Sequence, residues 1–487
     1  MLTMGNDRLG RWWLALASGL LAGLALPPLG LPPLLWLALV PLWALAGSDL
    51  GAWSGALWGA AAVLVSHRWL LGLHPLDWIG VPGPLSLPLA LLLLLLCALA
   101  GALLVALWVL LAQRLDPRRL SSALLLAAGW GLVEVLLAKG PLFWLGLGAA
   151  ALPGDRPLAG LAALGGSGLL AAVQLLLGWC LWRCYAAPQR RRWLVVTTAA
   201  VLLSHGAGAA ALAAMPLRGE GGSERVLVLQ PAIPTRRKFQ WDQQQQLQQR
   251  LAAALAEAAQ RSVDVVVLPE GALGLEPQLA QPVPVELISG GFRWQVVAGE
   301  PEQRSALLRL APGESRASSW LDKHRLVPLG EWVPLADLAR WSGLSAVGGL
   351  QPGAPSRLLL RPAGAIGGAI CYELSDGAAL AAAARDGAGW LLASANLDPY
   401  PLLLQQQFQA LAQLRAIETG RWLVSAANTG PSLLVNSRGL PVASLPSGRA
   451  ATGVFSVPRL QAPSAYDRWG ELPLLLVLVG AAWRRWG

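Results

Sequence analysis

Charged residues are scarce in this sequence. Only 13% of its 487 residues are Asp, Glu, Lys or Arg, whereas 55% are hydrophobic, and the mean hydropathy is +0.51. Soluble globular proteins carry about 25% charged residues, so the composition excludes an ordinary soluble protein. A chain of this length has room for a bundle of membrane helices and a separate domain with its own core.

Cysteine, histidine, phenylalanine and tyrosine are also few, at 4, 4, 5 and 4 residues. In the more polar part of the chain, residues 219–465, no pair of His or Cys has the spacing of metal ligands. A metal site is therefore not predicted, and no cofactor is expected. The 24 tryptophans are typical of a protein with many anchors at a membrane interface.

Long uncharged segments predict about eight membrane-spanning helices, because a helix needs about 20 apolar residues to cross a bilayer. The first uncharged stretch is long enough for two helices and contains two Pro-Pro pairs that divide it. The predicted spans are two segments between Arg11 and Asp49, then Asp49–His67, Leu89–Ala112, Leu120–Leu137, Arg156–Arg183, Arg192–Arg218 and the short Leu472–Ala482. The predicted domains are a seven-span bundle (1–218), a water-facing domain (219–465) and a C-terminal membrane helix (466–487).

Basic residues predict the orientation of these spans. They cluster in four segments that lie on the same side of the membrane if successive spans alternate in direction. These segments are Arg8 and Arg11, Arg114 to Arg119, Arg183 to Arg192, and Arg484 to Arg485. The positive-inside rule places these segments in the cytoplasm, so the seventh span delivers residues 219–465 to the outer face. The net charge of +10 follows from this topology and from attraction to anionic lipid, and predicts no nucleic-acid partner.

Strand-like and helix-like segments alternate in residues 219–465, which predicts an α/β domain with helices layered on sheets. The predicted helices are Gln243–Arg261, with Asp242 as its N-cap, Ala378–Arg385 and Gln405–Thr419. The predicted strands are Val226–Leu229, Val265–Leu268, Trp294–Ala298, Ser305–Leu310, Ala365–Ile370, Trp390–Ala395, Leu423–Ser425 and Ser432–Asn436.

Three segments of this domain carry candidate catalytic groups. Glu270 and Cys371 each directly follow an apolar strand, where side chains project into a shared cleft. The third segment, Asp322–Glu331, contains Lys323 and is not assigned to a strand end. It combines charges of both signs with a short apolar stretch.

Cys371 is the one cysteine of residues 219–465, so it has no disulfide partner there. Two interpretations stay open: a buried structural thiol, or a nucleophile. A nucleophilic thiol needs a base and a group that stabilises the oxyanion, which a carboxylate and an ammonium group supply. His324 is a rival base, but it neighbours Lys323, and adjacent side chains diverge on an extended chain.

The order Glu270, Lys323, Cys371 resembles the nitrilase (carbon–nitrogen hydrolase) superfamily. With the multispan N-terminal half, the chain resembles more narrowly the apolipoprotein N-acyltransferases of bacterial cytoplasmic membranes. The most specific matches are the segments from Lys323 to Pro334 and from Ile370 to Glu373. Further matches are Leu24–Pro28, Leu39–Leu42, Gln230–Pro234, Lys238–Asp242, Arg415–Glu418 and Asn428–Gly430.

This resemblance implies an αββα sandwich for the domain and a role for each matched residue. Cys371 would be the nucleophile, Glu270 the general base and Lys323 the oxyanion stabiliser, with Glu331 supporting them. Trp241, Tyr372 and Glu373 would handle substrate or hold the site. The implied substrates are a phospholipid acyl donor and the α-amine of a diacylglyceryl-cysteine at the N-terminus of an apolipoprotein. The implied location is the bacterial inner membrane, with the catalytic domain on the periplasmic face.

The sequence departs from the family pattern in two places. The loop Asn396–Tyr400 lacks the tryptophan that the family usually has after this strand, which affects predicted lipid contacts. In the fifth span, Glu134 is followed by Val135 instead of tryptophan, and Glu134 is interpreted either as a partner of Lys139 or as a functional intramembrane carboxylate.

Two alternative functions stay open. A membrane-tethered amidase or nitrilase would pass the acyl group to water instead of an amine. A transporter or lipid-binding protein would carry the same domain without catalysis.

Overall fold

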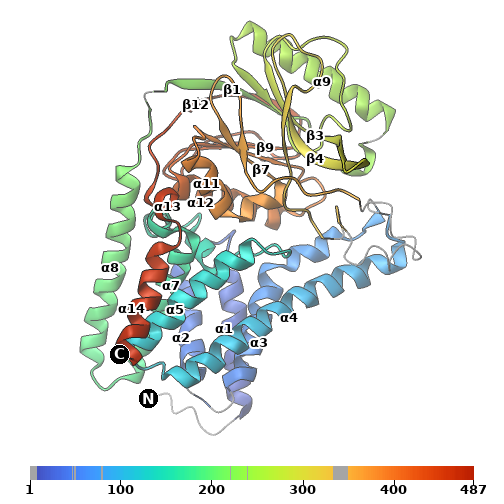
Figure 1. The fold of residues 1–487 in the computed structure, drawn as a ribbon. Coiled ribbons are helices and arrows are strands. Elements are labelled where there is room, and N and C mark those ends of the chain that lie inside the picture. Colours follow the sequence, from blue (N-terminus) through green and yellow to red (C-terminus); the bar gives the residue numbers. More distant parts are fainter. Residues whose placement is uncertain are drawn as a thin grey trace. The chain divides into compact units, whose positions relative to one another are not determined.

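Two compact units make up the chain. The computed structural model describes residues 8–46, 48, 51–77, 80–219, 221–238, 240–328, 330–332 and 349–486. Unit 1 comprises Met1–His74, Leu87–Ala214 and Arg468–Gly487. Unit 2 comprises Pro75–Ser86 and Met215–Asp467, and every strand described lies in it (Figure 1).

Unit 1 is helical, and each predicted span coincides with a helix. Four of these helices, α4, α5, α7 and α8, are long and apolar enough to cross a membrane by length and composition, so the chain is a multi-pass membrane protein. The helices are α1 (Arg8–Ala25), α2 (Pro32–Leu45), α3 (Gly51–Ser66), α4 (Gly83–Leu115), α5 (Leu120–Ala138), α6 (Arg156–Ala159), α7 (Ala162–Ala186), α8 (Arg190–Ala214) and α14 (Leu472–Trp486). Short 3₁₀ helices cover Arg68–Leu73 and Leu147–Ala151.

Small residues let the helices of unit 1 approach closely. A Cβ atom added to Gly131 of α5 would lie 2.3 Å from the carbonyl oxygen of Gly168 in α7. Glycine is required there because any side chain would push the two backbones apart. Between α2 and α7, the indole of Trp43 donates a hydrogen bond to the carbonyl oxygen of Leu175 at 3.0 Å. The buried indole therefore has a partner in a region without water.

Glu134 is buried in unit 1, with only 5% of its surface exposed. Its Oε1 atom accepts hydrogen bonds from the indole of Trp130 at 2.7 Å and from the backbone N–H of Leu147 at 2.8 Å. Among the described residues it forms no ion pair with Lys139. Of the two interpretations of Glu134, pairing with Lys139 is therefore wrong.

Unit 2 contains two six-stranded sheets. In the first, β1, β2 and β3 are parallel neighbours, and the strand order is β12-β1-β2-β3-β4-β5. In the second, β7, β8 and β9 are parallel, and the order is β11-β10-β9-β8-β7-β6. The strands are β1 (Ser223–Gln230), β2 (Val265–Val267), β3 (Glu286–Val297), β4 (Glu300–Leu310), β5 (Ser319–Asp322), β6 (Leu358–Leu359), β7 (Ile366–Ile370), β8 (Leu391–Ala395), β9 (Leu423–Ala427), β10 (Leu433–Val435), β11 (Pro441–Ser444) and β12 (Ala451–Pro458).

Helices cover the outer faces of both sheets, and the sheets contact each other through β1 with β9 and β4 with β7. On the first sheet, α9 (Trp241–Gln260) packs on β1 and β2 because Leu251, Ala254 and Ala258 lie on one face of that helix. On the second, α11 (Gly377–Arg385) packs on β7, and α12 (Leu402–Thr419) packs on β9 (Figure 1). The predicted α/β sandwich is confirmed. Unit 2 also contains 3₁₀ helices at Thr235–Arg237 and Cys371–Ser375, and it ends at Asp467 within α13 (Ala465–Trp469).

Two local predictions were wrong. Asp242 does not cap α9, because the helix begins at Trp241, two residues earlier than predicted, and Gln240 occupies the N-cap position. Lys323 does follow a strand, since Ser319–Asp322 forms β5 beside β4. This strand has four residues, too few for its alternation to be recognised in the sequence.

Candidate functional site

The sandwich brings the three predicted catalytic segments together. Glu270 is the third residue after β2, Lys323 directly follows β5 and Cys371 directly follows β7. The Nζ atom of Lys323 donates hydrogen bonds to Oε1 of Glu270 and to Oε1 of Glu331, each at 2.7 Å. The charges of Lys323, Glu270 and Glu331 also act on the thiol of Cys371. These four predicted site residues therefore belong to one cluster.

Lys323 is the centre of this cluster and is 1% exposed. Burial alone would lower the pKa of its ammonium group, but the carboxylates of Glu270 and Glu331 outweigh burial and raise that pKa well above its ordinary value. Lys323 is therefore a fixed cation. An ammonium held in a water-poor site is suited to stabilising a developing oxyanion.

Cys371 lies at a sharp turn between β7 and a 3₁₀ helix. Its φ angle is +52°, a left-handed conformation that residues with a Cβ adopt rarely and that is found at functional sites. Burial and the negative charge of Glu270 raise the pKa of its thiol well above the usual range, against the opposing charge of Lys323 and the backbone N–H of Tyr372. The resting thiol is therefore protonated and needs a base before it can act as a nucleophile.

Glu270 is held by contacts on both carboxylate oxygens. Oε1 accepts the hydrogen bond from Lys323, and Oε2 accepts one from the backbone N–H of Asn396 at 3.1 Å. Its backbone lies so close to β3 that a Cβ atom on Gly290 would be 2.4 Å from the Glu270 Cα. Glycine at position 290 therefore fixes where the Glu270 backbone can lie.

A second cation borders Glu270. Lys238 and Asn428 line a small cavity that also touches Glu270 and Asn396. Burial lowers the pKa of the Lys238 ammonium group, and the negative charge of Glu270 opposes that shift. Glu270 therefore has a second ammonium group near it, besides that of Lys323.

Glu331 supports Lys323 from the opposite side. Its Oε2 atom accepts a hydrogen bond from the backbone N–H of Val327 at 2.9 Å, so the loop after Lys323 folds back on itself. Burial raises the pKa of Glu331, and the charge of Lys323 opposes that shift. The predicted motif residues Phe239, Leu329, Val333 and Pro334 lie outside the described residues.

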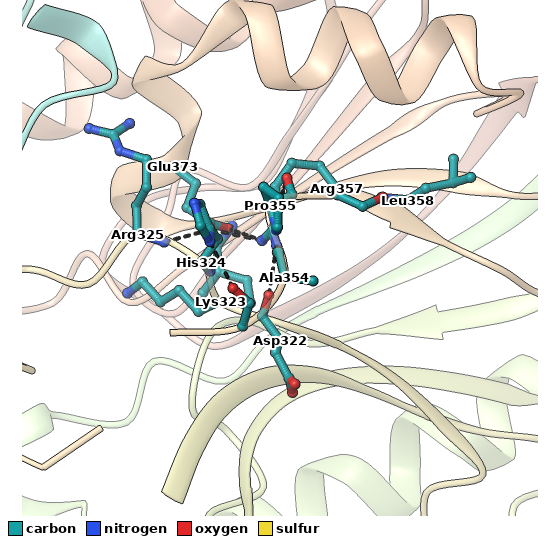
Figure 2. A network of polar contacts seen from close by, with 12 residues as sticks. Asp322, Lys323, His324, Arg325, Ala354, Pro355, Arg357, Leu358 and Glu373 are labelled. Atoms are coloured by element: carbon teal, nitrogen blue, oxygen red, sulfur yellow. Dashed lines mark hydrogen bonds and ion pairs between the residues drawn. The ribbon is translucent and has the colours of Figure 1, made fainter. Parts of the chain in front are cut away.

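Of the three remaining predicted residues, two lie beside Cys371 and one does not. The ring of Tyr372 is buried and stacks under the guanidinium of Arg325, 4.5 Å from the ring centroid. Glu373 is 3% exposed and accepts hydrogen bonds from several directions (Figure 2). Trp241, the first residue of α9, is 74% exposed and is not part of the buried cluster.

His324 does not serve as a base for Cys371 in this arrangement. Its Nδ1 atom donates a hydrogen bond to the carbonyl oxygen of Gly353 at 2.7 Å, and its backbone N–H donates to Glu373. The ring is therefore part of the structure that holds Lys323. In the described ranges, no group of three or more His, Cys, Asp and Glu side chains could hold a metal ion.

Sequence reasoning missed three residues of the site. Asn396 was noted only as a departure from a pattern, although it binds Glu270. Tyr400 lies within electrostatic reach of Cys371 and Glu270, and burial raises the pKa of its hydroxyl group. Arg357 pairs with Glu373, and no sequence motif marks it. The position of Asn396 after an apolar strand was a usable signal, because Glu270 and Cys371 occupy equivalent positions.

A protonated thiol, a carboxylate and a fixed ammonium group together can carry out acyl chemistry through a covalent intermediate. In such chemistry a carboxylate can take the thiol proton, the thiolate can attack a carbonyl carbon, and an ammonium group can stabilise the resulting oxyanion.

Comparison with known proteins finds relatives of both unit 1 and unit 2. The family model of the apolipoprotein N-acyltransferase N-terminal domain matches residues 18–180, and that of carbon–nitrogen hydrolase matches residues 322–459. An apolipoprotein N-acyltransferase of Prochlorococcus marinus (strain MIT 9313) is 49% identical, covering 98% of this chain and 96% of the relative. One from Parasynechococcus marenigrum (strain WH8102) is 48% identical, covering 96% of this chain and 98% of the relative.

The crystal structure of Saccharomyces cerevisiae Nit3, a member of branch 10 of the nitrilase superfamily, aligns with 49% of this chain and 90% of its own. Its sequence identity is 16% and the TM-score is 0.38. Identity of 49% over almost the full length of both chains shows the family directly. The chain belongs to the apolipoprotein N-acyltransferase family.

Proposed function

We propose that this protein moves an acyl chain from a phospholipid to the α-amine of an N-terminal diacylglyceryl-cysteine on apolipoproteins. The observation that carries the proposal is the Lys323 ammonium group held by hydrogen bonds to Glu270 and Glu331, three charges that also act on the thiol of Cys371. Full-length identity to apolipoprotein N-acyltransferases supports the choice of substrates.

The reaction has two half-reactions. In the first, Glu270 takes the proton of Cys371, and the thiolate attacks the ester carbonyl of the phospholipid. Lys323 stabilises the oxyanion, the ester C–O bond breaks, and the leaving lysophospholipid oxygen takes the proton from Glu270. In the second, the lipoprotein amine attacks the thioester and gives a proton to Glu270. The C–S bond breaks, and that proton returns to the thiolate.

A labelling experiment tests the proposal. The purified protein is incubated with a phospholipid that carries a fluorescent acyl chain, and protein-bound fluorescence is measured before and after a diacylglyceryl peptide is added. The expected result is a stable thioester on Cys371 that the peptide discharges, and no label on Cys371→Ala. Cys180→Ala, which removes a buried thiol of α7, is the matched control and should be labelled like the wild type. Rapid loss of label to water without peptide would instead indicate the hydrolase, and equal labelling of Cys371→Ala would contradict both.

The proposed topology has eight crossings, formed by α1, α2, α3, α4, α5, α7, α8 and α14. The proposed parts are the bundle (1–218), the catalytic domain (219–465) on the periplasmic face of the inner membrane, and the final helix (466–487). The clusters of arginine at alternate helix ends support this orientation. A membrane-impermeant thiol reagent tests it on intact spheroplasts of cells that express a cysteine-free variant with Glu257→Cys. Labelling is expected, and protection until the cells are lysed would reverse the orientation.

A further inference from the structure

The carboxylate of Glu373 joins two of the three catalytic segments. Its Oε1 atom accepts the backbone N–H groups of His324 at 2.7 Å and Arg325 at 3.1 Å, which directly follow Lys323. Its Oε2 atom accepts the backbone N–H of Ile370 at 3.0 Å, which directly precedes Cys371. One carboxylate therefore binds the backbone next to the cation and the backbone next to the thiol.

Arg357 completes this connection. Its Nη1 atom donates to both oxygens of Glu373, at 2.8 and 2.9 Å. Its Nη2 atom donates to the carbonyl oxygen of Asp322 at 2.9 Å, on the other side of Lys323, and also to the carbonyl oxygen of Ala354. Figure 2 shows Glu373 between the backbone at His324 and Arg325 on one side and Arg357 on the other. The backbone is thus bound both before and after Lys323.

The pair is fully inside unit 2. The side chains of Arg357 and Glu373 are 3% and 2% exposed. The free energy needed to remove two charges from water is about as large as the free energy gained from their attraction. A buried ion pair therefore contributes little net stability. Its retention here is explained better by the geometry that it imposes, because one planar guanidinium binds the Glu373 carboxylate through Nη1 and the Asp322 carbonyl oxygen through Nη2.

We propose that Arg357 and Glu373 are positioning residues that set the distance between the Lys323 ammonium group and the Cys371 thiol. They touch neither substrate nor reacting atoms; they act through the backbone on either side of Lys323 and before Cys371. This inference rests on the proposed function in taking Cys371 as the nucleophile and Lys323 as the oxyanion stabiliser. It assigns Arg357 a role that no motif gives it.

The test compares two conservative substitutions of buried arginines. Arg357→Lys keeps the charge, but one ammonium group cannot replace both Nη1 at the Glu373 carboxylate and Nη2 at the Asp322 carbonyl oxygen. Arg361→Lys is the matched control, because Arg361 is equally buried and its pairs with Glu224 and Glu286 touch no candidate catalytic residue. Three quantities are measured for each: the thermal midpoint, the rate at which Cys371 is acylated by labelled phospholipid, and the pH profile of Cys371 alkylation, located by peptide mass spectrometry.

The expected result is a similar fall in thermal midpoint for both variants, with acylation slowed about 100-fold only in Arg357→Lys, the size expected for a displacement of about 1 Å. The alkylation profile of Arg357→Lys should shift to higher pH, because the thiol moves away from the Lys323 cation that favours its ionised form. Arg361→Lys should keep the wild-type profile.

A second variant, Glu373→Gln, tests the proposal if Arg357→Lys does not fold. Glu373→Gln is nearly isosteric but turns an amide N–H₂ group toward backbone N–H donors, and it should also slow acylation and shift the alkylation profile. The proposal is overturned if Arg357→Lys acylates at the wild-type rate, or if its alkylation profile is unchanged. Unfolding of both Arg357→Lys and Glu373→Gln would also overturn the proposal, because the ion pair would then be required for folding and not for positioning Lys323 and Cys371. Alkylation needs no lipid substrate, so a shifted profile with no acylation in the wild type would reject the proposed function and leave this inference standing.

Discussion

Lys323 and Glu270 are 53 residues apart in the sequence, yet the lysine Nζ atom lies 2.7 Å from the glutamate Oε1 atom. With Glu331 at the same distance on another side, one positive charge is shared by two carboxylates. This surplus of negative charge disfavours a resting thiolate at Cys371. In the proposed mechanism, the thiol is activated when Glu270 accepts its proton.

Removal of the Glu270 charge should have opposite effects on two reactions of Cys371. Glu270 raises the pKa of the thiol, so Glu270→Gln should lower that pKa and increase the rate of iodoacetamide alkylation at neutral pH. Each unit by which the pKa falls increases the thiolate fraction about tenfold at a pH well below it. Phospholipid-dependent acylation should fall by about 10²–10⁴-fold, because the general base is lost.

Alkylation rates measured from pH 6 to pH 11 check this prediction. The wild-type thiol has a raised pKa, so its alkylation should be slow at neutral pH and should rise only above the ordinary range of thiols. Slower alkylation of Glu270→Gln than of wild type at neutral pH would contradict the assigned charge arrangement.

Loss of Glu331 should weaken the site without removing its base. Glu331→Gln leaves Lys323 with Glu270 as its charged partner and weakens the tie to the Val327 loop. Acylation should slow by up to about 100-fold through misplacement of the cation. Glu257→Gln is the matched control, because Glu257 pairs with Arg261 on the surface of α9, and such pairs contribute little. Equal rates for the two variants would show that Glu331 does not support Lys323.

A methyl group at position 290 should damage the site through the backbone. In Gly290→Ala the new Cβ would lie 2.4 Å from the Cα of Glu270, so either β3 or the segment after β2 must shift. We expect a loss of about 1–3 kcal/mol in the free energy of unfolding together with a large loss of acylation. In Gly389→Ala the nearest atom is 3.5 Å away, an ordinary contact, and both quantities should stay near wild type. Denaturant titration and the acylation assay check the pair.

Substitution of Trp241 should affect binding instead of chemistry. Its side chain is 74% exposed, so Trp241→Ala should change the free energy of unfolding by less than about 0.5 kcal/mol. If the exposed indole contacts a lipid substrate, as its family position implies, KM should rise several-fold while kcat is retained. The alkylation profile of Cys371 should not change. A loss of kcat with unchanged KM would place Trp241 in the chemical step.

Sequence reasoning located Glu270 and Cys371 because both follow apolar, β-branched or alanine-rich strands that end abruptly. It missed the strand before Lys323, because Ser319–Asp322 is too short to display a period. The helices of unit 1 were predictable from uncharged length alone. Their number of crossings stays a prediction, since α2 and α3 have 14 and 16 residues.

The contacts that hold the site could not be predicted in the same way. The pairing of Arg357 with Glu373 depends on β6 and β7 lying beside each other, and neither residue belongs to a recognisable chemical motif with the other. The exposure of Trp241 likewise follows from how α9 sits on its sheet. Resemblance to a family suggests which residues matter, whereas burial and orientation come only from the tertiary structure.

Unit 2 is assembled from two pieces of the chain, and this has a consequence for synthesis. Arg236 donates a hydrogen bond to the carbonyl oxygen of Pro75, 161 residues earlier, and pairs with Asp77. At a translation rate of about 5–20 residues per second, the segment Pro75–Ser86 emerges roughly 8–32 s before Arg236 exists. During that interval Arg236, the partner of Pro75 and Asp77, is still missing, and α4, α5, α7 and α8 are made. The catalytic unit therefore completes itself only after the ribosome has produced those helices.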